Sequence, residues 1–148
     1  MILAVIPCSK EKIWDIKPQQ QAVPAKLAYR SAFHRYARNY AQTHCNQHII
    51  FSAKYGLIKP EFLIQGPYDV TFSRPNDPCI SMMQLKKQAL QYQSATSIWI
   101  LCPKTYAQKL TQAFAELSPT LVFPLRNIGG FGCMHRFLKN NATTTSKP

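Results

Sequence analysis

The chain has 148 residues, 46% of them hydrophobic and 16% charged, a composition that excludes a disordered or fibrous protein and predicts one folded domain. Eighteen Lys and Arg residues against six Asp and Glu residues give a formal net charge of +12. Such a charge favours a polyanionic partner such as nucleic acid; a basic protein without such a partner, or one that binds an anionic membrane surface, is the alternative.

The first half of the chain predicts two strands that flank a helix. The apolar run ILAVI (2–6) is typical of a buried strand, and the turn PCSKEK follows it at once. Residues 24–44 carry apolar side chains at helical spacing. HIIFS (48–52) predicts a second buried strand, and AKYGLI predicts a loop closed by Gly56.

The second half continues the alternation of helices and strands. The predicted elements, in chain order, are a long ordered loop or lid at 60–78, a helix at 80–93, a strand at 97–102, a helix at 105–117, a strand at 121–125 and a glycine-rich turn at 127–132 that enters a short helix.

Alternating strands and helices predict the α/β class. We expect a single three-layer domain over residues 1–139, with a roughly four-stranded, mainly parallel sheet and helices on both faces, and a disordered tail over 140–148. In such sheets ligands bind beyond the carboxyl ends of the strands. The segments that follow the predicted strands are PCSK, SAKYG, CPK and NIGGFG, all of them polar, small or basic.

The PCSK turn allows three kinds of chemistry. A neighbouring Lys10 can lower the pKa of the Cys8 thiol and make it a nucleophile, and a desolvated Lys10 can itself form an imine. The third possibility is an anion cradle made of the turn amides with Ser9 and Lys10. The spacing of the residues does not separate these roles.

The segment after the second strand offers groups that suit a nucleobase and its phosphate. Ser52 stands at the end of the strand, and Lys54 and Tyr55, together with Ser9, can hold a base and the nearby phosphate. Tyr55 can stack on an extruded base, and Gly56 allows a ligand to approach closely. The alternative is that Tyr55 packs in the core while Lys54 is solvated.

The PYD segment contains one of the few carboxylates in the chain. Asp69, next to Tyr68, can activate water or stabilise a developing cation, although a structural ion pair or turn cap is an equal alternative. Farther along, Gly129 and Gly130 precede a helix whose free amides can bind an anion, and the side chains that follow them, His135 and Arg136, can contact phosphate.

No metal or cofactor is predicted. The five cysteines contain no C-x-x-C pair, and the histidines have no metal-ligand spacing with carboxylates. No apolar run approaches the roughly 20 residues of a membrane span, and the apolar start is too short for a signal peptide. We therefore expect a cytoplasmic protein without a membrane partner.

The combination PCSKEK, SAKYGL, PYD and a late G-G-F-G turn resembles a small family of bacterial and phage proteins and covers about residues 1–139. The PCS-x-x-K part is more distantly similar to YaaA-type stress proteins, which are associated with DNA binding. It also resembles the archaeosine synthase motif, whose lysine adds to a deazaguanine base. This chain reads IWD after Lys12, where the archaeosine motif has proline, tyrosine and histidine, which argues against base amidation.

The resemblance implies a link to antiviral DNA glycosylases with a uracil-DNA-glycosylase-like α/β scaffold. We therefore expect an enzyme that extrudes a modified base from DNA and cleaves its glycosidic bond, with Asp69 or Lys10 as the catalytic group. The alternatives are a non-catalytic nucleic-acid-binding protein and a lysine-dependent modification of a deazaguanine in RNA. The pocket residues carried over by the resemblance are Cys8, Ser9, Lys10, Ser52, Lys54, Tyr55, Gly56, Tyr68 and Asp69.

Overall fold

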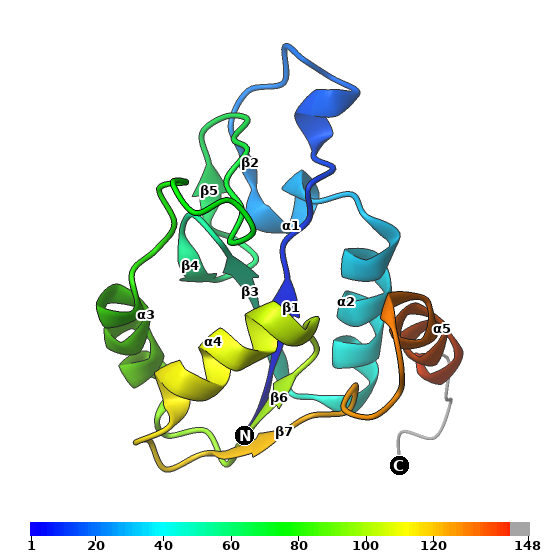
Figure 1. Ribbon diagram of the computed structural model, residues 1–148. Helices are drawn as coiled ribbons and strands as arrows, with labels where there is room; N and C mark the ends of the chain where they lie inside the picture. Colours follow the sequence, from blue (N-terminus) through cyan, green and yellow to red (C-terminus); the bar gives the residue numbers. More distant parts are fainter. Residues whose placement is uncertain (143–148) are drawn as a thin grey trace.

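A five-stranded sheet forms the centre of the molecule (Figure 1), which we describe from a computed structural model covering residues 1–142. The strand order is β4-β3-β1-β6-β7, and only β4 runs antiparallel to its neighbour. After its first residue, Ile2, the central strand is buried because helices cover both faces of the sheet, so it needs apolar side chains throughout. The strands are β1 (Ile2–Pro7), β3 (Gln47–Ser52), β4 (Gly56–Ile58), β6 (Ser97–Ile100) and β7 (Thr120–Val122).

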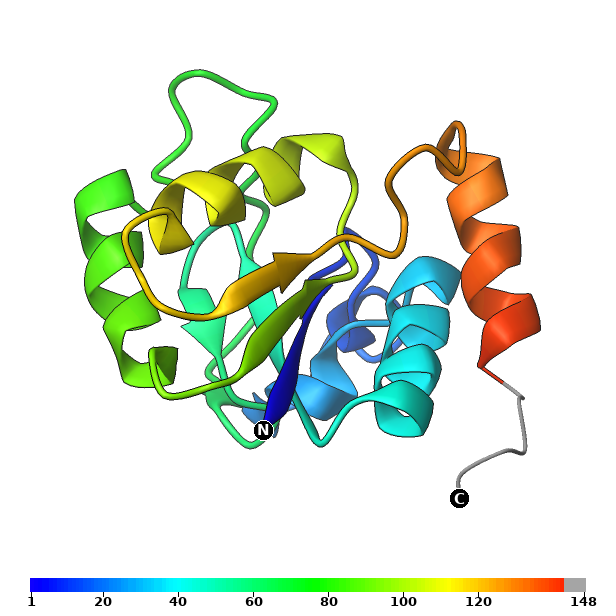
Figure 2. The same ribbon diagram turned by 90° about the horizontal axis from the view of Figure 1, so that it is seen from below.

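Two pairs of helices cover the two faces of the sheet, as Figure 2 shows from below. Ala4 and Ile6 point to the face covered by α2 and α5, whereas Leu3 and Val5 point to the face covered by α3 and α4. The predicted three-layer α/β domain is therefore confirmed, with five strands in its main sheet rather than about four. These helices are α2 (Ala32–His44), α3 (Met82–Ala89), α4 (Lys104–Phe114) and α5 (Phe131–Asn141).

The structure corrects two of the predicted elements. The segment after the second strand is not a loop: Gly56, with a φ of 77°, turns the chain back, and Gly56–Ile58 forms β4 against β3. The predicted helix over 24–44 is two helices, because the chain is extended at Tyr29. The second of them, α2, begins after Ser31, whose hydroxyl accepts a hydrogen bond from the backbone N–H of His34.

A small subdomain lies above the carboxyl ends of the main strands. It consists of a two-stranded sheet, the short helix α1 and a 3-10 turn. The predicted loop or lid over 60–78 supplies one of these strands and otherwise contains no helix or strand. The remaining elements are η1 (Ile13–Asp15), β2 (Val23–Pro24), α1 (Ala25–Ala28), β5 (Leu63–Ile64) and η2 (Leu90–Tyr92).

The last described helix extends into the segment expected to be a tail. α5 continues through Asn141, so residues 140 and 141 are helical, and the rest of that prediction, from residue 143, lies outside the described residues. Within residues 1–142 no helix is both long and apolar enough to cross a bilayer.

Candidate functional site

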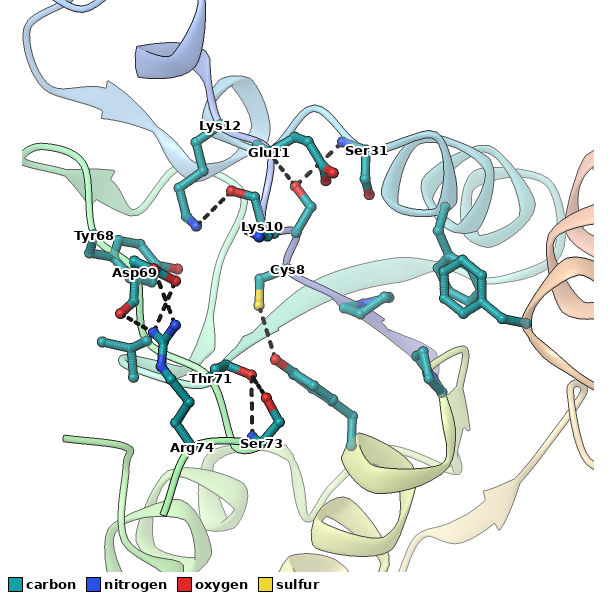
Figure 3. Close-up of a pocket in the computed structure, with 17 residues that line it drawn as sticks. Cys8, Lys10, Glu11, Lys12, Ser31, Tyr68, Asp69, Thr71, Ser73 and Arg74 are labelled. Atoms are coloured by element: carbon teal, nitrogen blue, oxygen red, sulfur yellow. Dashed lines mark hydrogen bonds and ion pairs between the residues drawn. The ribbon is translucent and has the colours of Figure 1, made fainter. Parts of the chain in front are cut away.

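A cavity of about 410 Å³ opens where the first turn, the PYD segment and the start of α4 meet (Figure 3). It lies beyond the carboxyl end of β1, the position expected for a ligand in a parallel sheet. The PCSK turn and the Tyr68–Asp69 pair, which are far apart in the sequence, both line it. Its lining residues are Pro7, Cys8, Ser9, Lys10, Glu11, Lys12, Ser31, Phe33, Tyr68, Asp69, Val70, Thr71, Ser73, Arg74, Pro103, Tyr106 and Phe131.

Cys8 lies at the wall of this cavity, directly after β1. Its backbone N–H donates to the Phe51 carbonyl at 3.0 Å, which ties the turn to β3, and its Sγ lies 3.7 Å from the Tyr106 hydroxyl. Burial raises the pKa of the Cys8 thiol above its ordinary value. Burial thus opposes the thiolate that a nucleophilic Cys8 would need, and the thiol stays protonated at neutral pH.

The hydroxyl of Ser9 holds the turn in shape. It donates to the carbonyl of Glu11 at 2.6 Å and accepts from the backbone N–H groups of Arg30 and Ser31 at 3.1 and 3.4 Å. The side chain is nearly buried. Ser9 therefore links the first turn to the start of α2 and has little capacity left for a ligand.

We expect Ser9→Ala to lower the free energy of unfolding by about 1–3 kcal/mol, because it leaves the backbone N–H of Ser31 without its acceptor, whereas the N–H of Arg30 keeps the Glu11 carbonyl at 2.9 Å. Urea denaturation followed by circular dichroism measures the change. Ser73→Ala, at an exposed serine of the same cavity, is the control and should change the stability by less than about 0.5 kcal/mol. Equal effects of the two variants would contradict this role of Ser9.

Lys12 is the buried cation of the site, with only 6% of its surface exposed. Its Nζ donates to the carbonyl of Lys10 at 3.1 Å and lies 4.4 Å from the centre of the Tyr68 ring, as Figure 3 shows. Among residues 1–142 no carboxylate forms an ion pair with it. Burial lowers the pKa of Lys12; a Cys8 thiolate, where it forms at high pH, and the Asp69 carboxylate oppose this shift.

A chain of buried hydroxyls supports the ring below Lys12. The Tyr68 hydroxyl bonds to the Tyr29 hydroxyl and, at 3.0 Å, to the Ser52 hydroxyl. Ser52 also accepts from the backbone N–H groups of Lys54 and Tyr55. Burial raises the pKa of both tyrosines, so both phenols stay protonated. Ser52 is thus fully buried below the site and reaches it only through Tyr68.

Asp69 stands at the rim of the cavity and is paired. One of its carboxylate oxygens lies 3.0 Å from the Arg74 guanidinium, which also binds Asp77 at 2.8 Å. The hydrogen bond and charge of Arg74 lower the pKa of Asp69, which makes its carboxylate a weaker base. The side chain of Asp69 is 68% exposed. The structural ion pair, one of the two alternatives for Asp69, is present.

The predicted catalytic lysine, Lys10, is exposed at the opening of the cavity. Its backbone carbonyl, rather than its side chain, makes the contact with the buried amine of Lys12. The two lysines therefore differ sharply in environment although they are two residues apart.

Several predicted residues lie away from the main cavity. Lys54 and Tyr55 line a separate open groove beside α3, although the Nζ of Lys54 also lies 5.3 Å from the centre of the Tyr68 ring. Gly56 packs against Gln88, whose side-chain oxygen accepts from the N–H of Leu57, so no ligand can approach it closely.

The predicted glycine-rich turn does precede a helix, but most of it lies outside the main cavity. Gly129 lines a second cavity, and Gly130 caps α5, whose first residue, Phe131, reaches the main cavity. His135 packs on Tyr36 with 4.8 Å between ring centres, and Arg136 is exposed.

Three residues of the site, Lys12, Tyr106 and Arg74, were not predicted from the sequence as site residues. Lys12 stands at the lysine position of PCS-x-x-K, so that spacing could have identified it. Tyr106 and Arg74 carried no such signal, because the fold alone brings the start of α4 and the loop after Asp69 to the first turn. Residues 1–142 contain no group of three or more His, Cys, Asp or Glu side chains that could hold a metal ion.

Fold and site together define an α/β protein with a cavity at the carboxyl end of a parallel sheet and a buried lysine in its wall. A model of a family of unknown function, DUF6884, matches residues 3–140, and the chain belongs to this family. It is also similar to a protein of Bacillus subtilis (strain 168) described as "Uncharacterized protein YfjM", with 34% identity over 134 residues that cover 89% of each chain.

Proposed function

We propose that the protein is a DNA glycosylase that takes an extruded, modified base into the Cys8 cavity and excises it through the amine of Lys12. The observation that carries the proposal is the buried Lys12, which has a lowered pKa and no carboxylate partner among residues 1–142. A buried ammonium is costly, and a lysine kept in such a place is suited to act as a neutral amine.

The cavity has the size and chemistry for a base. Its volume of about 410 Å³ falls within the roughly 300–1,000 Å³ typical of small-ligand sites. Tyr106 and Cys8 are both protonated at neutral pH, since burial raises the pKa of each, and they can therefore donate hydrogen bonds to a base. The net charge of +12 supports attraction of the DNA backbone.

The proposed step is a displacement at the sugar. The neutral amine of Lys12 attacks C1′, a C–N bond forms, and the N-glycosidic bond breaks as the base leaves with its electron pair. The amine loses a proton and the departing base takes one up, so protons balance. The C1′–O4′ bond of the sugar then breaks, O4′ takes up the remaining proton of the nitrogen, and the nitrogen lone pair forms the C=N bond of an imine between Lys12 and C1′.

Borohydride trapping tests this step, because hydride reduces the imine to a stable secondary amine. The protein is incubated with DNA carrying modified bases, borohydride is added, and the mass of the protein is measured. A covalent DNA adduct on Lys12 supports the proposal. Base release without any adduct would exclude the amine route.

A competing route, in which Asp69 activates water instead of Lys12 attacking the sugar, predicts a different result for Asp69→Asn. If Lys12 is the nucleophile, this variant should keep measurable base release, since Asp69 sits at the exposed rim and is paired with Arg74. If Asp69 activates water, release should fall by about 100-fold or more. Liquid chromatography of the released bases separates the two outcomes.

We expect base release to rise with pH, with a midpoint below the ordinary lysine value of 10.5, because only the neutral amine of Lys12 attacks. Its pKa is lower in the folded chain than in the unfolded chain. Burial of the Lys12 ammonium therefore costs no stability above the unfolded-state pKa, and it lowers the stability of the folded chain as the pH falls towards the folded-state pKa. Single-turnover rates between pH 6 and 11 measure the profile, and a rate that still rises without levelling off at pH 11 would contradict the assignment.

A lysine-dependent modification of a deazaguanine base in RNA is the second candidate. It is favoured by one observation: the buried Lys12, rather than the exposed Lys10, stands at the lysine position of PCS-x-x-K. The same trapping experiment with tRNA in place of DNA discriminates between the two candidates.

A further inference from the structure

A second cavity, of about 580 Å³, is lined by residues of α4 and of the segment that joins β7 to α5. Figure 2 shows the course of these two segments. At the start of α4, Pro103 lines the first cavity and Lys104 lines the second. At the start of α5, Phe131 lines the first and Gly129 the second. The two cavities therefore adjoin at the starts of α4 and α5.

The second cavity combines an apolar floor with a cationic rim. Leu125 and Met134 are among the apolar residues that line it, and its two charged lining residues are Lys104 and Arg126. Among residues 1–142 neither cation forms an ion pair. The Arg126 guanidinium stacks 3.9 Å above the centre of the Phe123 ring. The guanidinium is flat, and a base can also stack on it.

Two carboxamide side chains add donors and acceptors to this cavity. Gln108 lines it from α4 and Asn127 from the segment after β7. Within the described residues neither side-chain amide is hydrogen-bonded to the protein. Carboxamides match the donor and acceptor pattern on the edges of nucleobases.

We propose that the second cavity binds the nucleotide next to the extruded one, with its phosphate between Lys104 and Arg126 and its base over the apolar floor. This subsite rests on the proposed function, since the extruded base defines which nucleotide is its neighbour. It gives the protein a means to sense the nucleotide beside the excised base.

The first test removes both charges and measures binding of a fluorescein-labelled single-stranded 12-mer DNA by anisotropy at several salt concentrations. Lys104→Gln with Arg126→Gln should weaken binding about tenfold. The slope of log K against log salt should become shallower by about 0.7, the value for one phosphate contact on a single strand. Lys17→Gln with Lys86→Gln removes two exposed charges elsewhere and is the matched control.

The second test fills the cavity without changing the charge. Gln108→Trp places a large ring among the lining residues and should weaken binding as the charge variant does. Gln112→Trp, one turn farther along α4, exposed and outside the cavity, should bind like the unmodified protein.

The outcomes separate this subsite from the proposed function. If both test variants bind like their controls while bases are still released, the subsite is wrong and the glycosylase stands. If the variants lose binding while the unmodified protein releases no base from any DNA, the glycosylase is wrong and the second cavity remains a nucleotide-binding site without a neighbouring excised base. Failure of the unmodified protein to bind the 12-mer would overturn the subsite, and base release then decides on the glycosylase separately.

Discussion

Lys12→Met should abolish the borohydride-trapped adduct and lower base release by at least about 1,000-fold, because it removes the only amine buried in the wall of the Cys8 cavity within the described residues. Methionine has an unbranched side chain one heavy atom shorter than that of lysine, and it has no amine to form an imine. The adduct is quantified by denaturing gel electrophoresis and by mass spectrometry of the intact protein.

Lys10→Met is the matched control for this experiment. It removes the same charge two residues away, from a side chain that is exposed at the opening of the cavity. We expect it to keep most of the trapped adduct and to weaken DNA binding only slightly. Loss of the adduct in Lys10→Met with its retention in Lys12→Met would reverse the assignment and restore Lys10 as the nucleophile.

The Lys12→Met protein should also remain folded. Removal of a desolvated ammonium relieves a cost of folding, so the urea midpoint should equal or exceed that of the unmodified protein. A measured midpoint in this range shows that lost activity comes from the missing amine rather than from unfolding.

Phe51→Ala should lower the free energy of unfolding by about 3–5 kcal/mol, the largest stability effect that we predict. Phe51 is fully buried, and its ring packs against those of Phe72 and Tyr106, 5.6 and 5.3 Å away between ring centres. Its carbonyl accepts the N–H of Cys8, so the same residue connects the core to the site. Urea denaturation measures the loss of stability.

Phe131→Ala is the control for Phe51→Ala. Phe131 is 60% exposed and stacks on Phe33, so its removal should cost less than about 1 kcal/mol. A loss below about 1.5 kcal/mol for Phe51→Ala would mean that the ring is not the packed support described above.

The layered fold was predictable because its strands are short apolar runs separated by amphipathic helices. β4 was missed because GLI is only three residues long and follows a glycine that could equally close a loop. The break before α2 was missed because the apolar spacing continues through Tyr29, while the extended backbone there depends on tertiary contacts.

The site was predictable at the level of segments rather than of side chains. Cys8 and Asp69 were expected at one place and line one cavity, because the chain returns over the carboxyl end of β1. The PCS-x-x-K spacing distinguishes Lys12 from Lys10, but the burial of Lys12 depends on the direction that the turn gives its side chain. The same limit applies to Ser9 and Ser52, whose hydroxyls bind backbone groups that only the fold brings near.

The central claim is that a base enters the Cys8 cavity and is excised there by Lys12. Mass spectrometry of the small molecules released from DNA of varied modification tests it most directly. We predict that the unmodified protein releases a free base and that Lys12→Met releases none. If DNA is bound but no free base is released, whatever its modification, the result would contradict the account. It would indicate a protein that binds nucleic acid without catalysing a reaction on it.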